Sequence, residues 1–190
     1  MKNFTKLLMT VAALFTLSCT TDATDDLAVT LEGQTTLTLS LEESRTQLGE
    51  KADGVYPLYW SEGDKVAVNG LASSPLTGNQ AGGPAAEFTF SGALTYPYNI
   101  VYPAPAEGLT ATTEGLQVVS FLATQSYTVG SFCSGAAPMY GVVAEGSDGK
   151  IQLQHLAGAI CIAPKGEGVT LTSMSISSES GKIAGNFDLD

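Results

Sequence analysis

Apolar residues in this chain recur at every second position, and this spacing limits its possible folds more than any other feature. Leu37, Leu39 and Leu41 alternate with Thr and Ser in the run from Thr35 onward. Successive side chains of a strand point to opposite faces, so this run predicts a strand with one buried face. No segment longer than the N-terminal residues 1–18 shows helical spacing. The spacing therefore predicts strands throughout.

The predicted strands are short and separated by turn residues. In chain order they lie around Val66 and Val68, around Phe88 and Phe90, and at Tyr98–Tyr102, Leu116–Leu122, Met139–Val143, Ile151–His155, Ile160–Ala163, Val169–Ile176 and Ile183–Leu189. The apolar phase slips between Leu171 and Met174, which predicts a bulge there. Twenty-one Gly and eight Pro supply the turns. We predict an all-β fold, a β-sandwich of mostly antiparallel strands.

Composition excludes several classes of function. The 190 residues include 8 Lys and Arg against 19 Asp and Glu, for a net charge of −11. This charge argues against nucleic acid as a partner, because phosphate binding needs clustered basic residues. One His and three Cys leave few groups for a metal site or a nucleophile. We expect a non-enzymatic protein without a cofactor.

The N-terminus carries an export signal. Lys2 and Lys6 precede an apolar run, residues 7–15, that is too short to span a bilayer. Residues 1–18 are therefore predicted to be a signal peptide that plays no part in the fold. Residues 16–19 resemble a bacterial lipobox, which predicts acylation of Cys19. An ordinary cleaved signal or an uncleaved anchor is the alternative.

Two further regions follow this signal. Residues 19–34 are predicted to be a polar tether, and residues 35–190 a single folded domain. The acidic residues Asp22, Asp25 and Asp26 in the tether are typical either of a solvated linker or of a surface-export signal.

The remaining thiols and the single histidine admit structural interpretations. Cys133 and Cys161 could form a disulfide in an oxidising compartment. Alternatively Cys161, which lies in an apolar run, is buried as a small hydrophobe. His155 follows Ile151 and Leu153 at two-residue intervals, so it is expected on their inward face with its ring nitrogens bonded to backbone groups.

Three aromatic residues offer the main alternative function. Tyr56, Tyr59 and Trp60 lie close together in sequence and could stack on a sugar ring. In that case the protein would be a monomeric surface lipoprotein that binds a glycan or a host ligand. Packing of these aromatic side chains in the core or at a sheet edge is the structural interpretation.

Arg45 is the only arginine in the chain and directly follows the strand of Leu37, Leu39 and Leu41. Proteolysis concentrates in exposed loops, so a protease that cuts after Arg45 would release that strand. The vacated position would accept a strand from a neighbour. The alternative is that Arg45 is a solvent-facing charge beside a turn.

Seven short stretches along the chain form an ordered set, and they are Ser44–Thr46, Leu58–Val66, Tyr102–Ala104, Pro138–Gly141, His155–Gly158, Ile176–Glu179 and Ile183–Gly185. Together they resemble the fimbrillin-like lipoproteins of Bacteroidales, which include shaft, anchor and tip subunits of type V pili.

The resemblance implies a transthyretin-like β-sandwich in an outer-membrane lipoprotein anchored through Cys19. It implies cleavage by an arginine-specific protease between Arg45 and Thr46, and displacement of the strand that holds Leu37, Leu39 and Leu41. A donor strand from a like subunit would then fill the groove, building an adhesive fimbria on the cell surface. The motif Trp60–Asp64 would shape a turn into Val66.

The chain departs from the family in length, because a typical member carries a second sandwich after the stretch that matches Ile183–Leu189. The alternation continues to Asp190, so either the last strand closes the sheet or the sequence is part of a longer chain. Without a second domain, the subunit is expected to cap or anchor a fibre.

Overall fold

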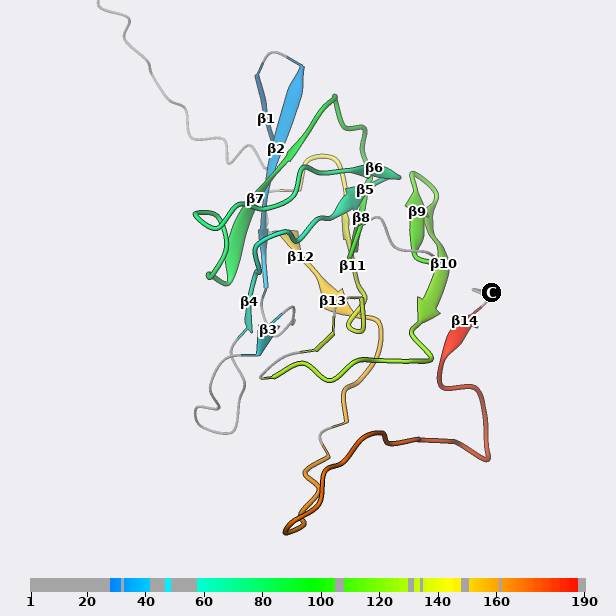
Figure 1. The fold of residues 1–190 in the computed structure, drawn as a ribbon. Helices are drawn as coiled ribbons and strands as arrows, with labels where there is room; N and C mark the ends of the chain where they lie inside the picture. The colour runs from blue at the N-terminus through cyan, green and yellow to red at the C-terminus, as the bar shows by residue number, and fades with distance from the viewer. Residues whose placement is uncertain are drawn as a thin grey trace, which may run out of the picture.

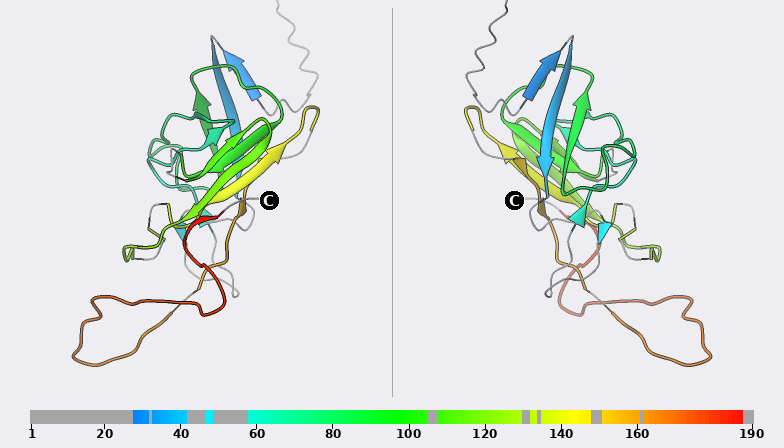
Figure 2. Two further views of the ribbon diagram at one scale, coloured as in Figure 1. Left: turned by 90° about the vertical axis from the view of Figure 1, so that its right-hand side faces the viewer. Right: turned by 90° about the vertical axis from the view of Figure 1, so that its left-hand side faces the viewer.

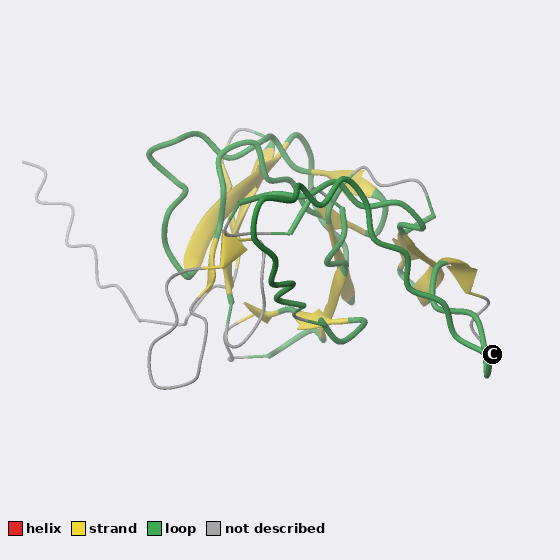
Figure 3. Ribbon diagram, turned by 60° about the horizontal axis from the view of Figure 1, so that its bottom comes forward, coloured by secondary structure: helices red, strands yellow, loops and turns green. Residues whose placement is uncertain are grey.

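The described part of the chain is all-β. The computed structural model describes residues 28–31, 33–41, 47–48, 58–104, 108–129, 132–133, 135–147, 151–160 and 162–187. Within these ranges there are strands and loops and no helix (Figure 3). All described strand pairs are antiparallel except one, β2 with β12. The prediction of an all-β, mostly antiparallel fold is confirmed.

The first sheet is built around β2 (Gln34–Ser40). On one side β2 pairs with β7 (Ala85–Phe90) along six residues. On its other side it pairs first with β1 (Ala28–Leu31) and then with β12 (Ile151–Gln152). Figure 1 shows the blue β1–β2 hairpin beside β7. β2 is therefore the central strand of this sheet.

The second sheet has five strands. Their order is β13 (Gln154–His155), β11 (Met139–Val143), β8 (Tyr98–Tyr102), β5 (Ala67–Val68) and β6 (Leu71–Ala72). The two-residue turn between β5 and β6 is Asn69-Gly70, and both residues have positive φ angles, 49° and 86°. This is the geometry that Asn-Gly hairpin turns favour.

The remaining strands form two smaller groups. They are a three-stranded sheet of β9 (Thr110–Thr112), β10 (Gly115–Phe121) and β14 (Gly185–Phe187), and a short pair of β3 (Gln47–Leu48) and β4 (Leu58–Tyr59). β9 lies close to β8 and β5.

Strand β8 is buried on both faces because it lies between two cores. Its residues Tyr98, Ile100 and Tyr102 belong to the main core, together with Leu37, Leu39 and Phe88 of the first sheet. Val101 points the other way, into a smaller core with Leu109 and Ala111 near β9. The two larger sheets thus pack as a β-sandwich-like pair, and the β9–β10 hairpin covers the outer face of the second sheet.

Two predicted strands are wrong. Residues 160 and 162–163, and all of Val169–Ile176, lie in loops in the structure, and their apolar side chains are exposed. Alternation alone does not make a strand, since the backbone also needs a neighbour, and no described strand pairs with either segment. We call residues 162–184 the extended segment; Figure 2 shows it extending away from the sandwich. The last predicted strand, Ile183–Leu189, is reduced to β14 in the described residues.

Two other boundaries differ from the sequence prediction. β1 pairs with β2 inside the range 19–34 that was predicted as a tether, so ordered structure begins before residue 35. The predicted strand Ile151–His155 is divided at Leu153, and its two halves join different sheets. The other predicted strands coincide with or overlap β2, β5, β7, β8, β10 and β11.

We predict that Gly141→Ala destabilises the fold by about 1–3 kcal/mol. A Cβ at Gly141 would lie 2.6 Å from the backbone oxygen of Gln152 and 2.8 Å from Cδ2 of Leu153, so β11 and β12 would have to move apart. Urea denaturation measures the effect. Gly158→Ala is the matched control, because its Cβ would meet nothing within 4 Å. Equal stability of the two variants would contradict the prediction.

Candidate functional site

The inward face of β2 and the residue after it is almost completely buried. The exposed fractions are 2% for Thr35, 0% for Leu37 and Leu39, and 6% for Leu41. These four side chains follow one another at every second position, as the sequence predicted for the three leucines. They bring N-terminal residues into the main core.

Backbone pairing on both sides holds β2 in place. Leu39 lies opposite Ala86 of β7 and opposite Ile151 of β12. Leu41 continues the pairing beyond the strand, because its N–H donates to the Pro84 carbonyl oxygen over 2.7 Å. Thr35–Leu41 thus lies between β7 on one side and β1 and β12 on the other. We call this position the β2 slot.

Two hydroxyl groups fix the ends of this strand. The Thr35 hydroxyl donates to the Gly92 carbonyl oxygen over 2.8 Å, and the Ser40 hydroxyl donates to the Ile151 carbonyl oxygen over 3.3 Å. Both acceptors lie far along the chain from their donors. The bonds therefore set the register of β2 as well as satisfying polar groups at the edge of the core.

The motif that begins at Trp60 forms a tight turn beside the main core. The Asp64 N–H donates to the Ser61 carbonyl oxygen, and the Ser61 N–H donates to Oδ2 of Asp64 over 2.7 Å. Gly63 has a φ of 86°, which favours glycine. The turn expected at the motif Trp60–Asp64 is confirmed.

Asp64 also connects this turn to the second sheet. The Tyr102 hydroxyl donates to Oδ1 of Asp64 over 2.8 Å. Burial raises the pKa of the Tyr102 hydroxyl well above its usual value, and the Asp64 carboxylate raises it further by its charge and by accepting the hydrogen bond. Tyr102 is therefore held neutral as a hydrogen-bond donor.

The proposed sugar-stacking surface is not available at Trp60. Its side chain is 0% exposed and packs edge to face against Phe88 and Tyr102, with ring centroids 4.8 Å and 5.5 Å away. A ring enclosed in this way cannot stack on a ligand from solvent. Tyr59 is half-buried, and Tyr56 lies outside the described residues. Packing in the core is the correct interpretation for Trp60.

Several predicted site residues lie outside the described residues. These are Cys19, Arg45, Thr46 and Cys161. Along the chain, Arg45 falls between the end of β2 and the start of β3, so β1 and β2 both precede it. The disulfide between Cys133 and Cys161 stays a prediction; Cys133 itself is half-buried in the loop before β11.

His155 is half-buried at the end of β13, opposite Met139 of β11, and is less enclosed than Ile151 and Leu153. Its expected inward position is therefore only partly realised. The division of the strand at Leu153 changes the sheet to which His155 belongs.

The described residues offer few other binding features. Within them no three His, Cys, Asp or Glu side chains gather as metal ligands, and no helix could cross a membrane.

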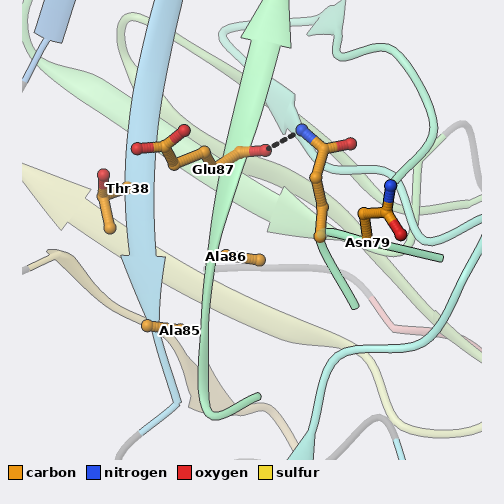
Figure 4. Close-up of a pocket in the computed structure, with 6 residues that line it drawn as sticks. Thr38, Asn79, Ala85, Ala86 and Glu87 are labelled. Atoms are coloured by element: carbon orange, nitrogen blue, oxygen red, sulfur yellow. Dashed lines mark hydrogen bonds between the residues drawn. The ribbon is translucent and has the colours of Figure 1, made fainter. Parts of the chain in front are cut away.

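An open hollow of about 260 Å³ lies on the outer side of β2 and β7 (Figure 4). Thr38, Gln80 and Glu87 line it, and the Gln80 side-chain amide donates to the Glu87 carbonyl oxygen over 3.5 Å. This shallow surface encloses no ligand-sized space.

Sequence reasoning missed two components of the β2 slot. Thr35 shares the phase of the three leucines, so the period-two pattern places it on the same face. The parallel partner β12 has no such signal, because pairing over more than a hundred residues leaves no local pattern.

No protein-family model, curated protein or solved structure matches this chain.

We predict that Leu39→Ala lowers the free energy of unfolding by about 2–5 kcal/mol, because it leaves a cavity under the centre of β2. Chemical denaturation measures the loss. Leu171→Ala is the matched control: Leu171 is 60% exposed, and its truncation should change stability by no more than about 0.5 kcal/mol. A comparable loss in both variants would be inconsistent with the different burial of the two leucines.

We also predict that stability falls above pH 10 partly through Tyr102. The unfolded side chain ionises near its usual pKa of 10.0, whereas folding raises that pKa. The stabilising effect is therefore complete below pH 10 and is lost as the pH rises further. Tyr102→Phe should lower stability at neutral pH by about 1–2 kcal/mol and flatten its decline above pH 10. Denaturation at several pH values tests this, with Tyr127→Phe at an exposed tyrosine as the control.

Proposed function

We propose that this protein is a structural subunit or anchor of a cell-surface fimbria, and that it supports adhesion and has no catalytic role. It is exported as a lipoprotein and attached to the outer membrane through lipid on Cys19. An arginine-specific protease removes the segment up to Arg45, and a strand from a like subunit takes the place of β2. The fold is a transthyretin-like β-sandwich, as the resemblance to the fimbrillin-like lipoproteins of Bacteroidales implies.

The position of β2 carries this proposal. It is the central strand of its sheet, yet β1 and β2 are the first two strands of the described chain. All other described strands follow Arg45 in sequence, and Arg45 is the only arginine in the chain. One cut after this residue therefore removes the covalent link between the rest of the domain and the innermost strand of the first sheet with its hairpin partner.

The released hairpin would leave a site suited to another strand. Hydrolysis of the Arg45–Thr46 peptide bond by water leaves a carboxylate on Arg45 and an amine on Thr46. Departure of β2 then exposes the edges of β7 and β12 and the core space of three leucines. Burying three such side chains contributes roughly 5–8 kcal/mol before ordering costs. A strand with the same alternation would recover this energy and pair with both edges.

We predict that Arg45→Ala prevents maturation and leaves a monomer with residues 19–45 still attached. An arginine-specific protease has no other site in this chain. The intact mass and N-terminal residue of protein from its own cell envelope, with electron microscopy of the surface, test this. Wild-type protein should begin at Thr46, and the variant at acylated Cys19.

Lys51→Ala is the matched control, because it removes a nearby positive charge and leaves the arginine in place. It should be processed and assembled like the wild type. Normal fibres from Arg45→Ala would refute the proposed maturation.

A further inference from the structure

The extended segment contains a run with strand-forming sequence and no strand partner among the described residues. Val169, Leu171, Met174 and Ile176 are 76%, 60%, 55% and 52% exposed. Four neighbouring apolar side chains on one projecting loop are unusual on a soluble surface and indicate a contact with another chain.

The sequence of this run is similar to that of the β2 slot. Residues 35–41 read Thr-Thr-Leu-Thr-Leu-Ser-Leu, and residues 169–176 read Val-Thr-Leu-Thr-Ser-Met-Ser-Ile. The two runs align when Ser173 is treated as one inserted residue. Four aligned positions are then identical: Thr170, Leu171, Thr172 and Ser175 correspond to Thr36, Leu37, Thr38 and Ser40. The other three positions differ: Val169, Met174 and Ile176 correspond to Thr35, Leu39 and Leu41. Apart from the one-residue slip at Ser173, the exposed run therefore has the alternation of the buried strand.

The differences between the two sequences are sterically mild. Met and Ile have nearly the volume of Leu, so the core spaces of Leu39 and Leu41 can accept them. Val has nearly the shape of Thr but lacks its hydroxyl group. The extra Ser173 requires a bulge, which strands accommodate as a single inserted residue. One contact would be lost, because Val169 cannot make the hydrogen bond that Thr35 donates to Gly92.

We propose that Val169–Ile176 of one copy occupies the β2 slot of a second copy, antiparallel to β7 and parallel to β12. This inference rests on the proposed function, because the slot becomes vacant only when β1 and β2 leave. It identifies the donor strand within the chain itself, and Leu171, Met174 and Ile176 as the side chains that replace the three leucines.

The arrangement of the extended segment favours a second copy as its partner. β13 before it pairs with β11, and β14 after it pairs with β10, so both ends are held to their own sandwich. Between these anchors the segment projects from the side of the molecule opposite the β1–β2 hairpin (Figures 1 and 2). It thus points away from its own slot.

Charge favours this part of the surface for contact between copies. Lys165 and Lys182 balance Glu167 and Glu179, so the extended segment is neutral in a chain with a net charge of −11. Contacts through other surfaces would bring two acidic bodies together, whereas this segment adds no repulsion of its own.

The experiment uses the full chain, cut with an arginine-specific protease and analysed by mass spectrometry and by size-exclusion chromatography with light scattering. Cut wild-type protein should form dimers and longer assemblies. The variant Leu171→Asp with Met174→Asp should be cut equally well but remain monomeric. Val129→Asp with Ile183→Asp is the matched control; these exposed residues lie outside the run, so this variant should assemble.

A mixing experiment identifies the donor and the acceptor. Uncut Arg45→Ala protein has an occupied slot and a free donor run, while the cut aspartate variant has a vacant slot and an impaired donor. Each should be monomeric alone, and together they should form a one-to-one complex. Failure to form this complex would overturn the inference.

The remaining outcomes separate the inference from the function on which it rests. Assembly of the cut aspartate variant would refute Val169–Ile176 as the donor and leave strand exchange standing. Cut wild-type protein that stays monomeric would refute both proposals. A monomer in which hydrogen exchange shows new protection of Val169–Ile176 would instead mean that the run fills its own slot.

Discussion

The two-sided pairing of β2 is the constraint on which the rest of the sandwich depends. A strand between two neighbours satisfies its backbone groups within the sheet and buries every second side chain. Here those neighbours are β7, about fifty residues away, and β12, more than a hundred residues away. The N-terminal strand therefore joins distant parts of the chain, and Leu37 and Leu39 supply the apolar surface against which the second sheet packs.

The second sheet depends on an equally enclosed strand, β8, whose residues face two cores. The buried turn at Trp60–Asp64 connects to it through the Tyr102 hydroxyl. These links do not involve β2. The link between the turn and β8 would therefore persist if β1 and β2 were released. A fold that exchanges its central strand needs such connections.

Strand exchange in this chain would be a competition between similar sequences. The run Val169–Ile176 carries the alternation of the β2 slot but lies exposed, whereas Thr35–Leu41 is buried. A strand that is continuous with its sheet has the advantage over one from another molecule, because it loses less translational freedom on pairing. Proteolysis at Arg45 removes that advantage, which explains why assembly would follow cleavage.

The sequence alone determined the all-β class, the inward face of β2 and most strand positions, because alternation and turn residues are local signals. It also singled out Arg45, whose place in the structure lies outside the described residues. Only the tertiary structure decided that Trp60 is enclosed, that β12 runs parallel to β2, and that Val169–Ile176 has no partner among the described strands. These three features depend on which strands become neighbours. Alternation in the sequence specifies that one face of a strand is buried, but it does not specify which element covers that face.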